Sequence, residues 1–510
     1  MLARRLAHRI PVRVRHYWKL LATCVAVLLA LVVTFSTVRV APLVTSASDE
    51  SGDRVSVDIA GTTDLFDATV AHTLRLTFRD KDYQELLEAY RTDGEKEYLE
   101  ADLVVDGVNL PSVGLRLKGN STLRSIAGGG GGRGGGFGGG STINTAEPET
   151  MPWLIRFDQY VDGRRYQGHR EIAVRVGGMG GGAAVLNEAV ALNVLAAAGE
   201  TTQRYAYSSF SVNGSPAVAR LIVEHPDENF ATSIGSGVLY KALAAGQFTD
   251  QGDDPTAYAD DFKQINLKGS QDLQPVIDLV RWVNTSSDAD FDAHLADHLD
   301  VASFARYAAT QNLLLNFDDM AGPGRNYYLW YDLSSRRFRV VGWDYNLTFS
   351  GDASQDPHET VSMGGFGRGG GGQPGGGQPG AGQPDGGQAG FPGGFPGGGQ
   401  LPDGMQPPGG GQNGGAPNGG GMRGGGGFGG HKLKERFLAS SAYRPAYDQA
   451  YRELYQKIYG NGAALTAVDG LATVLGTIDG TDAKTEADQL RATIRQRTEA
   501  LAASAVIAGS

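Results

Sequence analysis

An acidic residue, an amide and a second acidic residue, spread over one short region, carry the clearest chemical signal in this sequence. Asp318 lies in a polar stretch, Asn326 follows it, and Asp344 closes an apolar run further along the chain. One carboxylate can orient an attacking hydroxyl, while an amide and another carboxylate can hold Mg²⁺ on phosphate groups. The three residues therefore indicate phosphoryl-transfer chemistry. The alternative interpretation is an ordinary hairpin with polar residues at its ends.

A hairpin and the helical region before it must position these side chains. Residues 327–331 and 338–344 are rich in apolar and aromatic residues and predict two strands. Asn326 then precedes the first strand, and Asp344 ends the second. Kinase-like folds present a catalytic base and two metal ligands in the same order, as an Asp, an Asn, a hairpin and an Asp.

Longer sequence blocks around the hairpin make the pattern more specific. They read N-F-D-D-M-A-G-P-G-R-N-Y-Y-L-W-Y-D and then R-F-R-V-V-G-W-D-Y-N-L-T-F, with G-L-R-L-K-G-N-S and L-I-V-E-H further upstream. These blocks resemble the CotH family, the spore-coat protein H kinases, from Thr73 to the C-terminus. The resemblance implies an atypical protein kinase that uses ATP and a divalent metal, Mg²⁺ or Mn²⁺.

The resemblance also implies roles for individual residues. Asp318 keeps the spacing from Asn316 that the family motif shows, so it is preferred to Asp319 as the catalytic base. Asn326 is the expected metal-binding amide, and Asp344 is the principal metal-binding carboxylate.

Two parts of the sequence depart from the family pattern. Residues 173–178 read A-V-R-V-G-G where the family commonly has a basic-rich Leu-Asn-Leu-Asn stretch. In the family's W-D-x-D-x-T-F-G motif, Asn346 replaces the second Asp and Ser350 replaces the Gly. The amide of Asn346 keeps an oxygen ligand for the metal but removes a negative charge, so a weaker metal contact is expected. Asp352 is near enough in sequence to compensate.

The nucleotide-binding residues of a kinase have candidates upstream, in the expected order. A kinase places a cation on a strand after a glycine-rich loop, a Glu on the next helix to hold that cation, and then a hinge for adenine. Arg156 and Glu188 are the candidates for this ion pair, and Arg175 is a rival for the cation. Glu224 and His225 form the hinge candidate. A strand Arg and a helix Glu are also common surface residues.

The loop that covers the phosphates falls in a glycine-rich part of the chain. Gly119, Asn120 and Ser121 are the expected phosphate contact, because glycine lets backbone N–H groups approach phosphates closely. Residues 128–140 are nearly all glycine. Such a run loses too much conformational entropy on ordering to form a defined cradle, so we expect an inserted flexible loop.

Composition limits the classes of function. The chain has 510 residues and a net charge of −11, which argues against a general nucleic-acid role. The single cysteine, Cys24, excludes an intramolecular disulfide framework.

The N-terminus carries a membrane signal. Residues 20–38 are uncharged and long enough for a transmembrane helix. Basic residues precede this run and an acidic stretch follows it, so the predicted topology is a single-pass anchor with a cytoplasmic N-terminus and an extracytoplasmic main domain. A cleaved signal peptide is the competing interpretation.

The predicted fold class is α+β, a two-lobed atypical protein-kinase-like fold with an N-terminal transmembrane helix and disordered glycine-rich inserts. We expect a basic tail (1–19), an anchor (20–38), a linker (39–62) and a CotH-like kinase domain (63–361) with an insert at 127–141. A disordered Gly/Pro/Gln-rich insert (362–430) and C-terminal helices (431–510) that complete the domain follow. The second insert cannot bury enough apolar surface to offset the entropy of ordering.

The leading functional prediction is a kinase that transfers the ATP γ-phosphate to a hydroxyl of a protein Ser or Thr outside the cytoplasm. The alternative is a kinase-fold scaffold of the cell envelope or spore coat with weak or no activity, which the altered metal motif and the scarcity of extracytoplasmic ATP favour. Transfer to a non-protein acceptor, such as a cell-wall polymer, is a third interpretation. The protein partner stays unassigned.

Overall fold

The computed structural model describes residues 16–37, 55–119, 122–126, 143–177, 182, 184–361 and 430–509. Residues 1–366 and 428–510 belong to one compact unit, which contains every element named below. Asn120, Ser121, the expected insert at 127–141 and all but residue 430 of the expected insert at 362–430 lie outside the described residues.

The N-terminal part is a closed seven-stranded barrel in the order β2-β3-β4-β5-β7-β9-β8. Its strands are β2 (Ala71–Thr77), β3 (Leu99–Val105), β4 (Val108–Leu117), β5 (Trp153–Arg156), β7 (Glu171–Val174), β8 (Tyr205–Val212) and β9 (Val218–Glu224). Alternate residues of β2 and β3 are buried, as a strand with one face on a core requires. The parallel pairing of β2 with β8 closes the barrel around an apolar core that includes Trp153.

Short elements flank the barrel. A two-stranded sheet joins β1 (Val57–Ile59) to β6 (Arg164–Tyr166). Helix α4 (Asp80–Asp93) contacts β3 and ends at Gly94, whose φ of 73° is the left-handed conformation that glycine adopts at helix ends. Helix α5 (Leu186–Ala198) is buried on nearly every side and ends in the same way at Gly199, as predicted.

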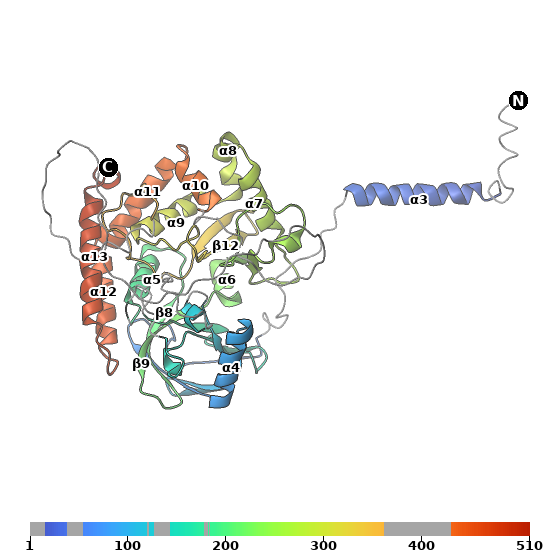
Figure 1. Ribbon diagram of the computed structural model, residues 1–510. Coiled ribbons are helices and arrows are strands. Elements are labelled where there is room, and N and C mark those ends of the chain that lie inside the picture. The colour runs from blue at the N-terminus through green and yellow to red at the C-terminus, as the bar shows by residue number, and fades with distance from the viewer. Residues whose placement is uncertain are drawn as a thin grey trace, which may run out of the picture. The chain divides into compact units, whose positions relative to one another are not determined.

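A second sheet and most of the helices form a separate apolar core. The sheet has the order β11-β10-β12-β13, with strands Phe262–Gln264, Gly237–Ala242, Tyr327–Asp332 and Phe338–Gly342. Its helices are α6 (Glu228–Ile234), α7 (Gln274–Thr285), α8 (Asp288–His298), α9 (Val301–Leu313), α10 (Lys432–Ala439), α11 (Arg444–Tyr455), α12 (Ala463–Leu475), α13 (Lys484–Ala502) and α14 (Ala505–Ala508) (Figure 1). The mixed helix and strand content confirms the α+β prediction. The assignment of the two parts to kinase lobes stays a prediction.

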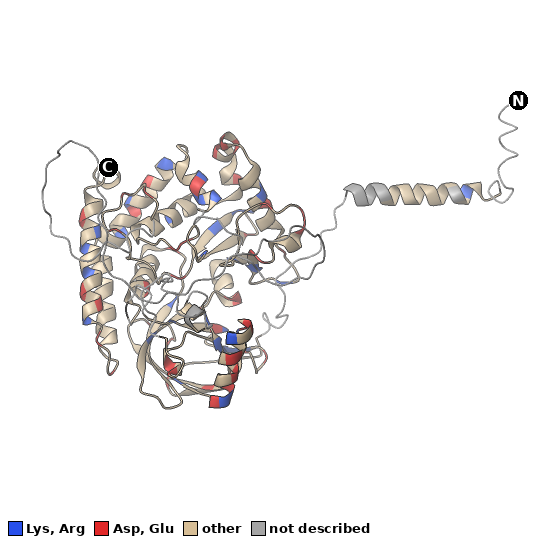
Figure 2. Cartoon of the chain, in the orientation of Figure 1, with Lys and Arg blue, Asp and Glu red and all other residues tan. Residues whose placement is uncertain are grey.

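Buried polar side chains join the C-terminal helices to the rest of this core. Arg497 of α13 is 0% exposed and donates to the backbone oxygens of Asn312, Ala353 and Gln355. Tyr451 of α11 donates to Asn312 Oδ1 over 2.7 Å. Helix α13 carries both acidic and basic residues (Figure 2). These contacts fix the chain after Asp344 against α9 and α13.

The predicted membrane anchor overlaps helix α3 (Trp18–Thr37). Across the residues that the structure describes, no helix has both the length and the apolar character that a membrane span requires. The anchor is therefore not confirmed.

Candidate active site

The β12–β13 hairpin brings Asn326 and Asp344 to the same end of the second sheet. Tyr327 pairs with Gly342 in the antiparallel register, and the Trp343 N–H donates to Asn326 O over 3.2 Å. Asp344 follows directly and has a left-handed φ of 57°. A non-glycine residue in this conformation stores backbone strain, which is common at functional sites.

Asp318 is fixed in the loop between α9 and β12. Its Oδ1 accepts the Gly324 N–H over 2.6 Å, and its Oδ2 accepts the Asn326 Nδ2 over 3.0 Å. A Cβ at Gly324 would lie 2.7 Å from Asp318 Oδ2, so a larger residue there would displace the Asp318 carboxylate. The structure thus brings the predicted base and the predicted metal amide into direct contact.

The environment of Asp318 suits a general base. Burial, with smaller contributions from the negative charges of Asp344 and Asp319, raises the pKa of its carboxyl to about 6. A base is most effective when its pKa lies near the working pH. Because Asp318 is only 9% exposed, this shift has a clear physical cause in desolvation.

Asp319, the rival base, is already committed to other contacts. Its carboxylate forms a buried ion pair with Lys434 of α10 and accepts the Ala321 N–H over 2.8 Å. Protonation of Asp319 by a substrate would break that buried pair. This arrangement favours Asp318 as the base and gives Asp319 a part in positioning the loop.

Arg175, just after β7, forms the ion pair with Glu188 of α5. Arg175 Nη2 lies 2.5 Å from Glu188 Oε1, and Arg175 Nη1 lies 3.3 Å from Asp344 Oδ1. Burial raises the pKa of Glu188 to about 7, against the lowering effect of Arg175. One guanidinium therefore connects the helix Glu with the carboxylate at the end of the hairpin.

The predicted pairing of Arg156 with Glu188 is wrong. Arg156 Nε instead lies 2.6 Å from Asp158 Oδ1 and 4.0 Å from Glu171 Oε1. The cause is strand register, because Arg156 on β5 pairs directly with Glu171 on β7. Arg175, the rival candidate, takes the position next to Glu188.

Three cations surround the Trp343 ring. The distances to the ring centroid are 5.2 Å from Lys118 Nζ, 4.8 Å from Arg175 Cζ and 5.9 Å from Lys241 Nζ. Burial lowers the pKa of Lys241 to about 8, and it lowers that of Lys118 strongly, with repulsion from Lys241 and Arg175 adding to the effect. Lys118 directly follows β4 and Lys241 lies on β10, and no sequence motif identified either lysine as a site residue.

A model of the CotH kinase protein family matches residues 115–379 of this chain. The chain belongs to the CotH kinase family. The matched range includes every candidate site residue and starts later than Thr73, where the sequence resemblance begins. It ends before α10–α14, so the family match does not include the C-terminal helices. No curated protein matches this chain significantly.

The expected hinge of this CotH-family chain lies next to the three cations around Trp343. The His225 ring meets Trp343 edge-on at 5.6 Å, and His225 Nδ1 lies 2.9 Å from Glu171 Oε2. Burial and the positive charge of Lys118 lower the pKa of His225 to about 3, so the ring is neutral. Glu224 ends β9 and accepts the Arg204 N–H over 3.1 Å. Their contact with adenine stays a prediction.

The residues at the hairpin end fit a divalent cation in their chemistry. Asp344 Oδ1 is buried and has Arg175 Nη1 at 3.3 Å as an ion-pair partner, but it accepts no hydrogen bond from the described residues. Asn326 uses its Nδ2 to donate to Asp318 Oδ2 and to Asp318 O, which leaves its carbonyl oxygen for another ligand. Mg²⁺ takes one or two such oxygens and completes its shell with water and phosphate. No cluster of three or more His, Cys, Asp or Glu side chains converges as a metal site in the described ranges.

Three further predicted residues have defined surroundings. Asn346 accepts the Asn187 Nδ2 on its backbone oxygen over 2.5 Å. Asp352 accepts hydrogen bonds from the backbone and hydroxyl of Ser354, over 2.8 and 2.7 Å, which commits its carboxylate to a local turn. Gly119 has a left-handed φ of 111° and accepts the Lys96 Nζ over 2.5 Å. Their roles stay predictions.

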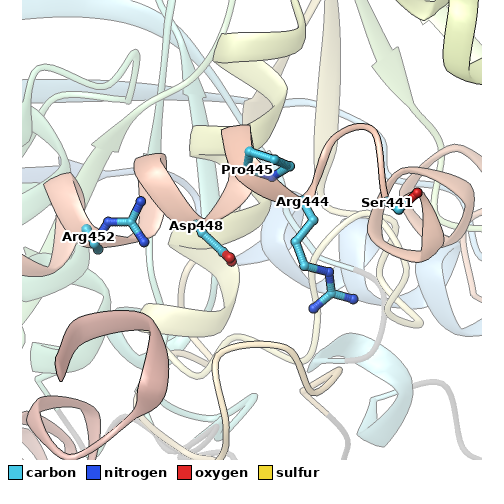
Figure 3. A pocket seen from close by; sticks show the side chains of 5 residues that line it. All are labelled: Ser441, Arg444, Pro445, Asp448 and Arg452. Atoms are coloured by element: carbon cyan, nitrogen blue, oxygen red, sulfur yellow. The ribbon is translucent and has the colours of Figure 1, made fainter. Parts of the chain in front are cut away.

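A surface cavity of about 430 Å³ lies along α11 and is separate from these residues (Figure 3). Arg444 and Arg452 lie on either side of Asp448. Asp448 Oδ1 is 2.6 Å from His358 Nε2, so its charge already has a partner. The alternation of charges along this cavity identifies no class of ligand.

Proposed function

We propose that this CotH-family kinase transfers the γ-phosphate of ATP to a hydroxyl group, with protein Ser or Thr as the acceptor class, on the extracytoplasmic side of a membrane. Membership of a kinase family supports ATP and a divalent metal as cofactors. The composition of the N-terminal segment supports the location, which includes an anchor at residues 20–38 and a cytoplasmic N-terminus.

The observation that carries the proposal is a cluster of three partly buried cations, Lys118, Arg175 and Lys241, beside Asp344. Arg175 has two carboxylate partners, but neither Lys118 nor Lys241 forms an ion pair or side-chain hydrogen bond within the described residues. Burial holds the pKa values of both lysines low, and repulsion from neighbouring cations adds to the effect, which is an unfavourable state for two lysines. A triphosphate would relieve this repulsion because it brings negative charge to the cations.

Each side chain around this cluster would have a separate role in the reaction. Asp318 would accept the proton of the acceptor hydroxyl as oxygen attacks the γ-phosphorus, and the bond to the leaving β-phosphate oxygen breaks. Lys118, Arg175 and Lys241 would stabilise the charge on the phosphates. Asn326 and Asp344, with Asn346 as a further predicted oxygen ligand, would hold Mg²⁺ or Mn²⁺, which supplies charge neutralisation when bound.

Label transfer from γ-³²P-ATP tests the proposal. The full chain is incubated with ATP, Mg²⁺ or Mn²⁺ and Ser/Thr-containing peptides, beside Asp318→Asn, Asp319→Asn and Asp352→Asn. Transfer should be lost in Asp318→Asn and unchanged in Asp352→Asn, whose carboxylate serves a local turn. Wild-type transfer by Asp318→Asn would refute the assignment of the base.

The second candidate function is a kinase-fold scaffold of the cell envelope or spore coat. Asn346 favours it, because an amide at this position removes a negative charge from the predicted metal site. This candidate predicts no label transfer with either metal and no metal-dependent ATP binding, while the fold stays intact.

A further inference from the structure

The N-terminus of α5, the helix that carries Glu188, has no side-chain cap from its own N-cap residue. The residue before α5 is Val185, which has a left-handed φ of 53° and provides no side-chain cap. The first N–H groups of a helix need acceptors from elsewhere, and a buried helix end without them is unfavourable. In α5 this end is also where the site residue lies, because Glu188 is in the first turn.

Glu486, in the first turn of α13, supplies an acceptor for the first N–H of α5 and one for the chain just before it. Its Oε1 accepts the Leu186 N–H over 2.8 Å, and its Oε2 accepts the Ala184 N–H over 3.2 Å. A carboxylate at this position is also favourable with the helix dipole. A Cβ at Gly182 would lie 2.3 Å from Glu486 Cδ, so the chain before α5 makes room for this carboxylate.

Three consecutive residues at this end of α5 connect three different parts of the molecule. The Leu186 N–H contacts Glu486 of α13. The Asn187 side chain donates to Asn346 O over 2.5 Å and to Thr348 O over 3.2 Å, in the segment after Asp344. Glu188 pairs with Arg175. A shift of the first turn of α5 must therefore move Glu188 and loosen the chain beside Asp344 together.

We propose that Glu486 is a positioning residue for the nucleotide site, which it sets by fixing the first turn of α5 so that Glu188 meets Arg175. Helices α12 and α13 both contact α5 (Figure 1). Helix α13 lies beyond residues 115–379, so the nucleotide site would depend on a helix outside the range that the family match includes.

Hydrogen exchange and ATP titration of the full chain test this inference together. The variants are Glu486→Ala, Glu486→Gln as the conservative change, and Glu499→Ala as a matched control on the exposed side of α13. Glu486→Ala should exchange faster both in residues 184–190 and in residues 343–349, Glu486→Gln should fall between it and wild type, and Glu499→Ala should match wild type. Faster exchange confined to 184–190, or the same change in Glu499→Ala, would overturn the inference.

The nucleotide readout rests on the proposed function. Loss of a helix cap corresponds to about a five-fold to ten-fold change in an equilibrium, so the Kd and KM for Mg-ATP should rise by about that factor in Glu486→Ala with a smaller change in kcat. An unchanged KM with a lower melting temperature would show a purely structural role and overturn the inference. If wild type itself binds no ATP, the proposed function fails, while the exchange data still decide whether Glu486 positions α5 and the chain beside Asp344. If Glu486→Ala does not fold, Glu486→Gln decides by the same comparison.

Discussion

Removal of one partner from the Arg175–Glu188 ion pair should destabilise the protein by an amount that depends on which partner is removed. The two charged atoms lie 2.5 Å apart, and the side chains are 11% and 1% exposed. Breaking a buried pair leaves one charge uncompensated and typically costs about 3–5 kcal/mol of the free energy of unfolding.

The surroundings decide which substitution costs more. In Arg175→Met, Glu188 stays buried beside Asp344, and its pKa, already raised to about 7 by burial, rises further. Proton uptake then limits the loss to about 3 kcal/mol at neutral pH. In Glu188→Gln, Arg175 keeps Asp344 at 3.3 Å and the Trp343 ring at 4.8 Å, so we expect a loss of only about 1.5 kcal/mol.

The pH dependence of Arg175→Met follows from the same shift. Its Glu188 has a higher pKa in the folded protein than in the unfolded chain, so folding takes up a proton. Stability is then greatest below the unfolded pKa of about 4.3 and is lost as the pH rises through the folded value. The free energy of unfolding of this variant should fall more steeply than that of wild type between about pH 5 and pH 8.

Urea denaturation of the full chain measures these differences in a double-mutant cycle. Arg175→Met and Glu188→Gln should couple by more than about 1 kcal/mol. Arg156→Met is the matched control, because its guanidinium pairs with Asp158, and it should be additive with Glu188→Gln within about 0.5 kcal/mol. Equal losses for the two single variants together with a coupling below about 0.5 kcal/mol would refute the reasoning.

Three other predictions concern the cations around Trp343 and the base. Burial, with repulsion from Lys263 and Arg116, lowers the pKa of Lys241 to about 8, so the affinity for Mg-ATP in calorimetry should fall as the pH rises through that value. Lys241→Arg should remove this pH dependence, and an identical profile in that variant contradicts the assignment. Lys434→Met should lower the free energy of unfolding by about 3 kcal/mol and reduce turnover more than ATP affinity, whereas unchanged turnover would show that Asp319 does not position the loop. Gly324→Ala should keep ATP binding but lower turnover at least about ten-fold, against Gly470→Ala as a control with open space around its Cβ.

The hairpin and its end residues could be predicted because their signals are local. Apolar strands with polar ends predicted Asn326 and Asp344 as neighbours, and the strands of the structure agree within a few residues. The end of α5 at Gly199 is local in the same sense, since a left-handed glycine closes the helix.

The choice between Arg156 and Arg175 depended on information that the sequence does not contain. Both lie on or beside strands, but the register of β5 against β7 places Arg156 opposite Glu171 and leaves Arg175 to meet α5. Lys118, Lys241 and Lys434 come from distant parts of the chain, and only tertiary folding brings the first two to Trp343 and the third to Asp319. The cap from Glu486 has no local signal, because its carboxylate accepts from Leu186, which lies 300 residues earlier in the sequence.

The central claim is a metal-dependent nucleotide site at the end of the β12–β13 hairpin, and calorimetric titration of the full chain with ATP tests it most directly. The titration is run with Mg²⁺, with Mn²⁺ and without metal, for wild type, Asp344→Ala and Asp352→Ala. The account predicts binding that requires a metal, is lost in Asp344→Ala and is retained in Asp352→Ala. Equal binding by Asp344→Ala, or no binding by wild type with either metal, would contradict it.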